Sequence, residues 1–132
     1  MLTERGGLPL ANLLTPANRH DSVVFEALLD AVPPIRQPNG RRRKRPAKLH
    51  AAKAYDIPRC RQALRCRHIG IRIARKGIDS SERLGRHRWV VERTLAWLNR
   101  YRRLTVRDER RADIHDAFLT LGCALICFKA LP

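Results

Sequence analysis

The spacing of hydrophobic residues along the chain predicts strands and helices in alternation. Residues 8–15 (LPLANLLT) form an apolar run between Gly-Gly and Thr-Pro, which is typical of a short buried strand. Helical spacing is clearest where Val91, Leu95 and Leu98 form one stripe. The predicted elements are, in order, strand 8–15, helix 21–32, strand 48–52, helix 58–67, strand 71–74, helix 84–102 and helix 113–129. This order predicts an α/β fold with parallel strand pairs.

One strongly basic segment interrupts this alternation. Residues 35–46 (IRQPNGRRRKRP) cannot build a core, so we predict a basic loop within a single domain of 132 residues. The longest apolar run, residues 117–128, is too short to span a bilayer. The first residues include Glu4 and Arg5 and do not resemble a secretory signal. We therefore expect no membrane association.

Charge is the strongest global signal. The chain has 28 Lys and Arg against 12 Asp and Glu, a net charge of +16. The excess lies in the middle, because residues 36–67 carry twelve basic side chains and one acidic one. Nucleic acid is the expected partner, since neutralising phosphates releases condensed counterions. The alternative is an arginine-rich protein of a GC-rich genome, or a ribosomal type of protein.

The cysteines and histidines do not predict a metal or redox site. None of the four cysteines forms a C-x-x-C pair, so they are expected as reduced thiols, and the five histidines lack ligand spacing. These residues are Cys60, Cys66, Cys123, Cys127, His20, His50, His68, His87 and His115.

Three ordered blocks of residues point to a family. They are GLPLA with TPANRHD (7–11 and 15–21), LHAAKAYD (49–56), and RWVVERTLAWL with YRRL (88–98 and 101–104). In this order and spacing they resemble the DDE transposases of bacterial insertion sequences, of the type of insertion-sequence family five. The resemblance covers nearly the whole chain.

The resemblance implies a ribonuclease-H-like fold, a mixed sheet with flanking helices. In that fold two aspartates and a glutamate hold two Mg²⁺ ions for DNA strand cleavage and transfer, because carboxylate oxygens must place both ions in line with the attacking and leaving oxygens. We expect residues 1–132 to be a partial catalytic domain whose first strands are missing. The expected function is that of a truncated, catalytically defective transposase.

The same resemblance assigns one acid and removes another. Glu92 takes the position of the family's glutamate in an R-x-x-x-E helix with Arg88, which makes it the expected catalytic residue and metal ligand. A solvated helix ion pair is the alternative for Glu92. Ala52 stands where the second acid is expected, and Asp56 lies four residues too late to replace it. The first acid is expected upstream of Met1, and Glu4 is expected to be a surface residue of a turn.

DNA of the insertion-sequence ends and of the target is the expected partner. A homo-oligomer, or a complex with the product of an upstream reading frame, is a further partner to consider, and the expected location is the bacterial cytoplasm with its nucleoid. A non-catalytic DNA-binding protein, or an inhibitor or partner subunit of an intact transposase, is the alternative function. The expected DNA contacts are Arg41, Arg42, Arg43, Lys44, Arg45, Lys53, Arg88, Arg93, Arg100, Arg102 and Arg103.

Overall fold

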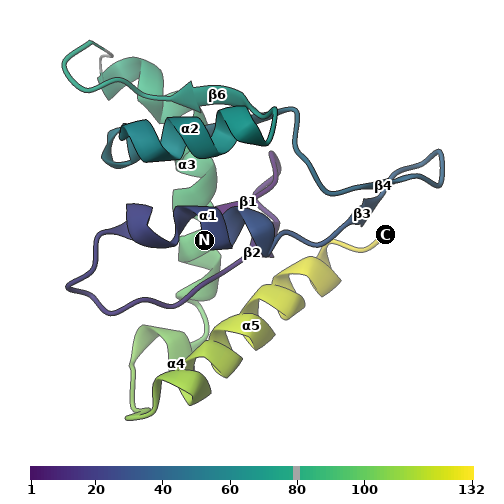
Figure 1. The fold of residues 1–132 in the computed structure, drawn as a ribbon. Helices are drawn as coiled ribbons and strands as arrows, with labels where there is room; N and C mark the ends of the chain where they lie inside the picture. Colours follow the sequence, from purple (N-terminus) through teal and green to yellow (C-terminus); the bar gives the residue numbers. More distant parts are fainter. Residues whose placement is uncertain (79–80) are drawn as a thin grey trace. The chain divides into compact units, whose positions relative to one another are not determined.

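A computed structural model describes the backbone of residues 1–78 and 81–132, and the side chains of residues 1–78 and 89–132 (Figure 1). The chain forms two compact units. The first, called here the terminal unit, combines Met1–Leu14 with Trp89–Pro132. The second, called here the central unit, is Thr15–Arg88.

The central unit is built on a β–α–β element. Strand β5 (Lys48–Ala51) pairs in parallel with β6 (Gly70–Ile73), and helix α2 (Pro58–Cys66) connects them. Proline suits the first turn of α2 because it lacks a backbone N–H, and a helix leaves its first N–H groups without intrahelical partners. In Figure 1 α2 lies alongside β6. All three elements agree with the predictions, which placed them at 48–52, 58–67 and 71–74.

The core of the central unit comes from the inner faces of these elements and of helix α1 (Phe25–Asp30). Leu64 and Cys60 are almost fully buried on α2. The remaining buried hydrophobic residues of this unit are Phe25, Leu28, Leu29, Val32, Leu49, Ala63, Ile69, Ile73 and Ala74. Burial of these side chains is the main stabilising contribution to this unit.

The first predicted helix differs from the structure at its start. The chain forms a 3₁₀ helix, η1 (Asp21–Val24), before α1 begins. The side chain of His20, rather than Asp21 or Ser22, caps η1, because its Nδ1 accepts the backbone N–H of Ser22 at 3.2 Å. The helix ends at Asp30, slightly before the predicted end at residue 32, and Pro33-Pro34 follows, where proline cannot continue a helix.

The segment expected as a basic loop is a β-hairpin. Strands β3 (Ile35–Arg36) and β4 (Arg42–Arg43) pair antiparallel around a turn at Pro38-Asn39-Gly40. Gly40 has a φ of 78°, in the left-handed region that glycine adopts without strain. Backbone pairing and this turn therefore order the segment, although it has no hydrophobic core of its own.

The terminal unit contains an antiparallel pair and three helices. Strands β1 (Leu2–Thr3) and β2 (Pro9–Ala11) pair, and α3 (Ser81–Leu98) reaches this unit with its last turns. The helices α4 (Arg102–Thr105) and α5 (Ala112–Lys129) follow. Predicted strand 8–15 was too long and less buried than expected, because its partner β1 has only two residues.

The predicted helix 84–102 is divided in the structure. It ends at Leu98, and the extended backbone of Tyr101 starts α4. This turn lets Leu104 of α4 pack against a buried cluster, which consists of Leu98 at the end of α3 and Cys123 and Ile126 of α5. The predicted helix 113–129 is confirmed as α5.

The fold class is mixed α/β. The sheets among residues 1–78 and 81–132 are three separate two-stranded pairs, of which only β5–β6 has the expected parallel direction. In this described part of the chain, no helix is long and apolar enough to cross a membrane.

Candidate nucleic-acid interface

Glu92, the expected catalytic acid, lies on α3 in the terminal unit, where its side chain is exposed. The neighbouring turn of α3 is a packing element. The hydroxyl of Thr94 is fully buried and donates to the carbonyl of Gly7 at 2.6 Å. Gly7 has a φ of 93°, and a Cβ there would lie 3.2 Å from Thr94 Oγ1. This close approach anchors α3 to the turn between β1 and β2.

Arg93, an expected DNA contact, is engaged within the terminal unit. Its guanidinium carbon lies 4.3 Å from the ring centroid of Trp89 and 4.8 Å from that of Trp97, which are cation–π distances. Its Nη2 also donates to the carbonyl of Gly6. Arg93 therefore binds α3 to the N-terminal turn and sits between two tryptophans.

Glu4 closes that same turn. Its Oε1 accepts the backbone N–H of Leu8 at 3.0 Å, while its own N–H donates to the carbonyl of Leu8 at 2.9 Å. The expectation that Glu4 is a residue of the turn agrees with this geometry, which gives its carboxylate a structural role.

Ala52 lies at the carboxyl end of β5 in the central unit. Its backbone is extended, and it precedes the 3₁₀ helix η2 (Lys53–Tyr55) as its N-cap. The carboxyl ends of parallel strands are where α/β proteins place their functional groups. A methyl group at this position offers no ligand to a metal ion.

Asp56, four residues later, is committed to the structure around it. Its Oδ1 accepts Nε of Arg61 at 2.8 Å, and its Oδ2 accepts the backbone N–H of Lys76 at 2.9 Å. Arg61 also donates to the carbonyl of Ile73, the last residue of β6. The hydrogen bond from Lys76 and the one from Arg61 hold the pKa of Asp56 below its ordinary value. Asp56 thus joins α2 to the end of β6.

The residues at hand do not fit a two-metal site. Among the described side chains, no group of three or more His, Cys, Asp or Glu is arranged to hold a metal ion. Glu92 belongs to the terminal unit and Ala52 to the central unit.

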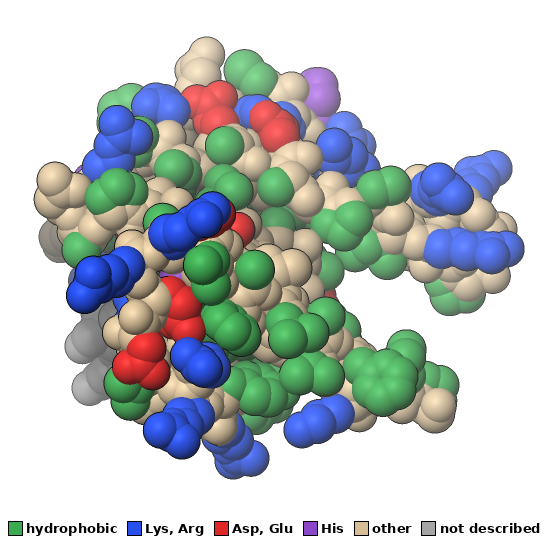
Figure 2. Space-filling model, turned by 90° about the horizontal axis from the view of Figure 1, so that it is seen from below, with side chains coloured by type: hydrophobic (Ala, Val, Ile, Leu, Met, Phe, Trp, Pro, Cys, Tyr) green, Lys and Arg blue, Asp and Glu red, His purple; other side chains and the backbone are tan. Residues whose placement is uncertain are grey.

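The hairpin and the two residues after it carry a run of five exposed cations. Arg41, Arg42, Arg43, Lys44 and Arg45 are all exposed, and Figure 2 shows Lys and Arg side chains gathered on this hairpin. Within residues 1–78 and 89–132, none of these five cations forms a salt bridge to an acid. Nε of Arg43 donates only to the carbonyl of Arg45.

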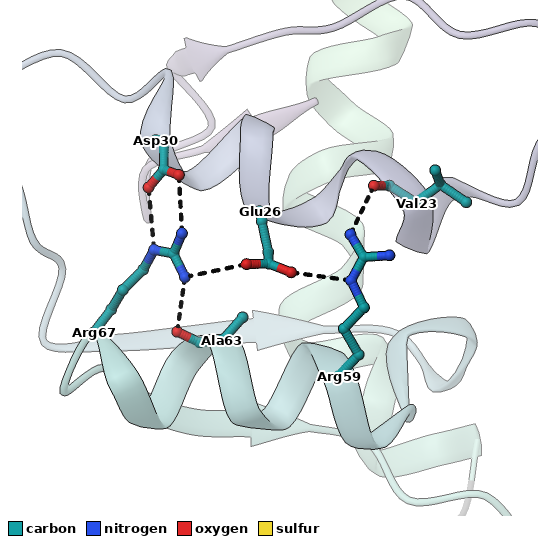
Figure 3. A network of polar contacts seen from close by, with 6 residues as sticks. All are labelled: Val23, Glu26, Asp30, Arg59, Ala63 and Arg67. Carbon is teal, nitrogen blue, oxygen red and sulfur yellow. Dashed lines mark hydrogen bonds and ion pairs between the residues drawn. The ribbon is translucent and has the colours of Figure 1, made fainter.

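In contrast to the hairpin cations, the arginines at the start and end of α2 form ion pairs with acids of α1 (Figure 3). Arg67 forms a fork with Asp30, with nitrogen–oxygen distances of 3.1 and 2.9 Å, and reaches Glu26 at 3.7 Å. Arg59 binds Glu26 at 3.0 Å and the carbonyl of Val23 at 3.2 Å. These pairs connect α2 to α1, and the Arg67 side chain holds the pKa of Asp30 below its ordinary value. Two kinds of arginine are thus present: those that pair within the fold and those that face solvent.

The other expected DNA contacts differ in their surroundings. Arg100 and Arg102 are exposed near the turn between α3 and α4, and Lys53 is half-buried at the start of η2. Arg103 pairs with Glu109 at 3.1 Å. Arg88 lies outside the residues whose side chains the structure describes.

The comparison with known proteins decides the family. A sequence profile of the family described as the transposase DDE domain matches residues 1–127. The chain belongs to this family. A protein of Burkholderia cepacia named "Putative transposase for insertion sequence element IS402" is 50% identical over 131 residues, 99% of this chain. The chain spans 62% of the length of that relative. No solved structure matches the chain.

The expected membership among the DDE transposases of insertion sequences is therefore confirmed. Arg36 was not among the basic residues expected to contact DNA. It lies opposite Arg42 in the register of the hairpin and is exposed. The Asn39-Gly40 dipeptide is a hairpin signal that could have revealed this pairing.

Proposed function

We propose that this chain is a DNA-binding domain of the insertion-sequence transposase type, with a ribonuclease-H-like core, which does not cleave DNA by itself. The observation that carries the proposal is the combination of family membership with the surface of the hairpin, where five consecutive cations are exposed and none forms a salt bridge to an acid among the described residues. A net charge of +16 supports the same partner, duplex DNA.

The proposed loss of cleavage rests on the carboxylates that could bind Mg²⁺. Ala52 occupies the strand end where the resemblance expects an aspartate, and the nearby Asp56 is engaged by Arg61 and Lys76. Glu4 is likewise engaged, with the backbone of Leu8. The expected Mg²⁺ site of Glu92 then lacks the carboxylate that an aspartate at position 52 would supply. The proposed location is the bacterial cytoplasm, at the nucleoid.

A binding and cleavage experiment on the full chain tests both parts. Fluorescence anisotropy with a labelled duplex of an insertion-sequence end should show binding that weakens as salt rises, because counterion release drives it. Incubation of the same duplex with Mg²⁺ should leave it intact. Absence of binding would refute the DNA-binding function. Mg²⁺-dependent nicking that Glu92→Ala abolishes would refute the claim of inactivity.

The variant Ala52→Asp adds a second measure. We expect it to leave the duplex uncleaved, because it adds a single carboxylate and no group of three or more His, Cys, Asp or Glu among the described side chains is arranged to hold a metal ion. The variant Ala52→Asn is the matched control of similar size without charge. Cleavage by Ala52→Asp alone would mean that a complete metal site can form in this chain, and the proposed cause of inactivity would be wrong.

Retained DNA binding without cleavage also favours a second candidate, that of an inhibitor or partner subunit. Such a chain would occupy the same DNA ends as an intact transposase. Adding the chain to a cleavage reaction of an active, related transposase should lower its rate in proportion to the DNA ends occupied. An unchanged rate at saturating chain concentration would exclude inhibition.

A further inference from the structure

The β3–β4 hairpin is basic on both of its faces. Side chains of paired residues lie on the same face of an antiparallel ribbon, and successive residues alternate between faces. Ile35 pairs with Arg43 and Arg36 pairs with Arg42. By this alternation Arg41 and Arg43 share one face, while Arg36 and Arg42 share the other. We call these the Arg41/Arg43 face and the Arg36/Arg42 face.

Neither face is covered by the central unit. The four arginines are all exposed, as is Ile35 at 40%. Residues 35–46 contain no acidic side chain, and none of the four arginines has a salt bridge to an acid among the described residues. A ribbon that rests flat on a polyanion would need only one cationic face, since its second face would point to solvent.

The dimensions of a two-stranded ribbon select one groove of DNA. Sheets pack about 10 Å apart face to face, which is the thickness of one strand layer with its side chains. The major groove of B-DNA is about 12 Å wide, while the minor groove is about 6 Å wide. A ribbon that stands on edge in the major groove would therefore present one face to each phosphate wall.

From these observations we propose that the β3–β4 hairpin enters the major groove of duplex DNA edge-on, with the Arg41/Arg43 face against one phosphate backbone and the Arg36/Arg42 face against the other. This inference rests on the proposed DNA binding and adds its geometry. The contacts are to phosphates, so the hairpin positions the protein on DNA with little selection of sequence.

Salt dependence of binding by the full chain tests the two faces separately. The double variants are Arg41→Ser/Arg43→Ser and Arg36→Ser/Arg42→Ser, and the control is Arg19→Ser/Arg65→Ser, which removes two exposed arginines elsewhere in the central unit. Each phosphate contact contributes about 0.9 to the slope of log Kd against log salt, so each hairpin pair should lower the slope by nearly 2. The control should leave it nearly unchanged. Circular dichroism of each variant should match the original chain, because all six side chains are exposed.

The outcomes are distinct. Similar loss of slope from both hairpin pairs, and an additive loss in the quadruple variant, would support insertion between two walls. A lower slope in only one hairpin variant would mean that the hairpin lies flat on the DNA. An unchanged slope in both hairpin variants, or an equally lowered slope in the control, would place the DNA contact elsewhere. Each of these results would overturn the inference. Failure of the original chain to bind duplex DNA would instead refute the proposed function.

Competition with groove-specific ligands tests the choice of groove. Methyl green, which occupies the major groove, should displace the chain from duplex DNA, and distamycin, which occupies the minor groove, should not. A single strand of the same sequence should bind more weakly, since it has no groove with two walls. Displacement by distamycin alone, or equal affinity for the single strand, would overturn the assignment to the major groove.

Discussion

At the scale of single residues, several charged side chains in or near the family's motifs have structural roles. Glu4 closes the turn between β1 and β2, and Asp56 joins α2 to the end of β6. Arg93 lies between Trp89 and Trp97 and donates to the backbone of Gly6. Breaking the existing hydrogen bonds of a carboxylate or guanidinium costs free energy. These residues are therefore poor candidates for binding a metal ion or DNA.

Gly7 allows a direct test of this local packing. In Gly7→Ala the new Cβ would lie 3.0 Å from Arg93 Nη2 and 3.2 Å from Thr94 Oγ1, on a backbone with a φ of 93°. We expect the free energy of unfolding to fall by about 1–3 kcal/mol, as measured by urea denaturation. Gly40→Ala is the matched control, because its φ is 78° but nothing lies within 4 Å of the added Cβ. Equal losses would show that the contact with α3 contributes nothing.

At the scale of elements, the sequence was most informative where hydrophobic spacing is regular. The β5–α2–β6 element was predicted to within a residue or two, because its apolar positions and Pro58 mark both period and boundaries. The β3–β4 hairpin was not predicted as such, since strands of two exposed residues show no hydrophobic alternation. The break between α3 and α4 was missed because the packing of Leu104 against α5 decides it.

The packing of α5 leads to a prediction at this scale. Gly122 is buried in α5, and a Cβ there would lie 3.0 Å from both Leu98 Cδ2 and Leu104 Cδ1. Gly122→Val should lower the free energy of unfolding by about 1–3 kcal/mol through overpacking. Ala124→Val, which adds a β-branched side chain at an exposed position of the same helix, should have a small effect. Thermal or urea denaturation of both variants measures the difference, and an equal effect would contradict the close packing of α5 with α3 and α4.

At the scale of the whole molecule, charge is divided between pairing and exposure. Arg59 and Arg61 of α2 and Arg67 at its end bind Glu26, Asp56 and Asp30, whereas the arginines of the hairpin face solvent. Ion pairs within the fold therefore neutralise only some of the arginines. The exposed arginines of the hairpin remain available to contact DNA, as the proposed function requires.

Acid stability follows from the paired aspartates. The pKa values of Asp30 and Asp56 are lowered in the folded chain, mainly by Arg67 for the first and by Lys76 and Arg61 for the second. A lowered folded pKa contributes stability that is present above the unfolded pKa, here 3.8, and is lost as pH falls through the folded value. We expect urea midpoints to decrease on acidification below about pH 4. The decrease should be smaller in Asp56→Asn, and an identical pH profile in that variant would contradict a role for this pair.

The sequence by itself determined the family, the β5–α2–β6 element and the last helix, and it predicts that Ala52 stands in place of an acid. Those features depend on local spacing and on the identity of single residues, both of which can be read along the chain. Tertiary structure decided which charges are available. Asp56 is bound by the backbone of Lys76 and Arg67 is bound by Asp30, which are contacts between segments distant in sequence that no local pattern encodes. The hairpin arginines are exposed because no other segment of the central unit covers them.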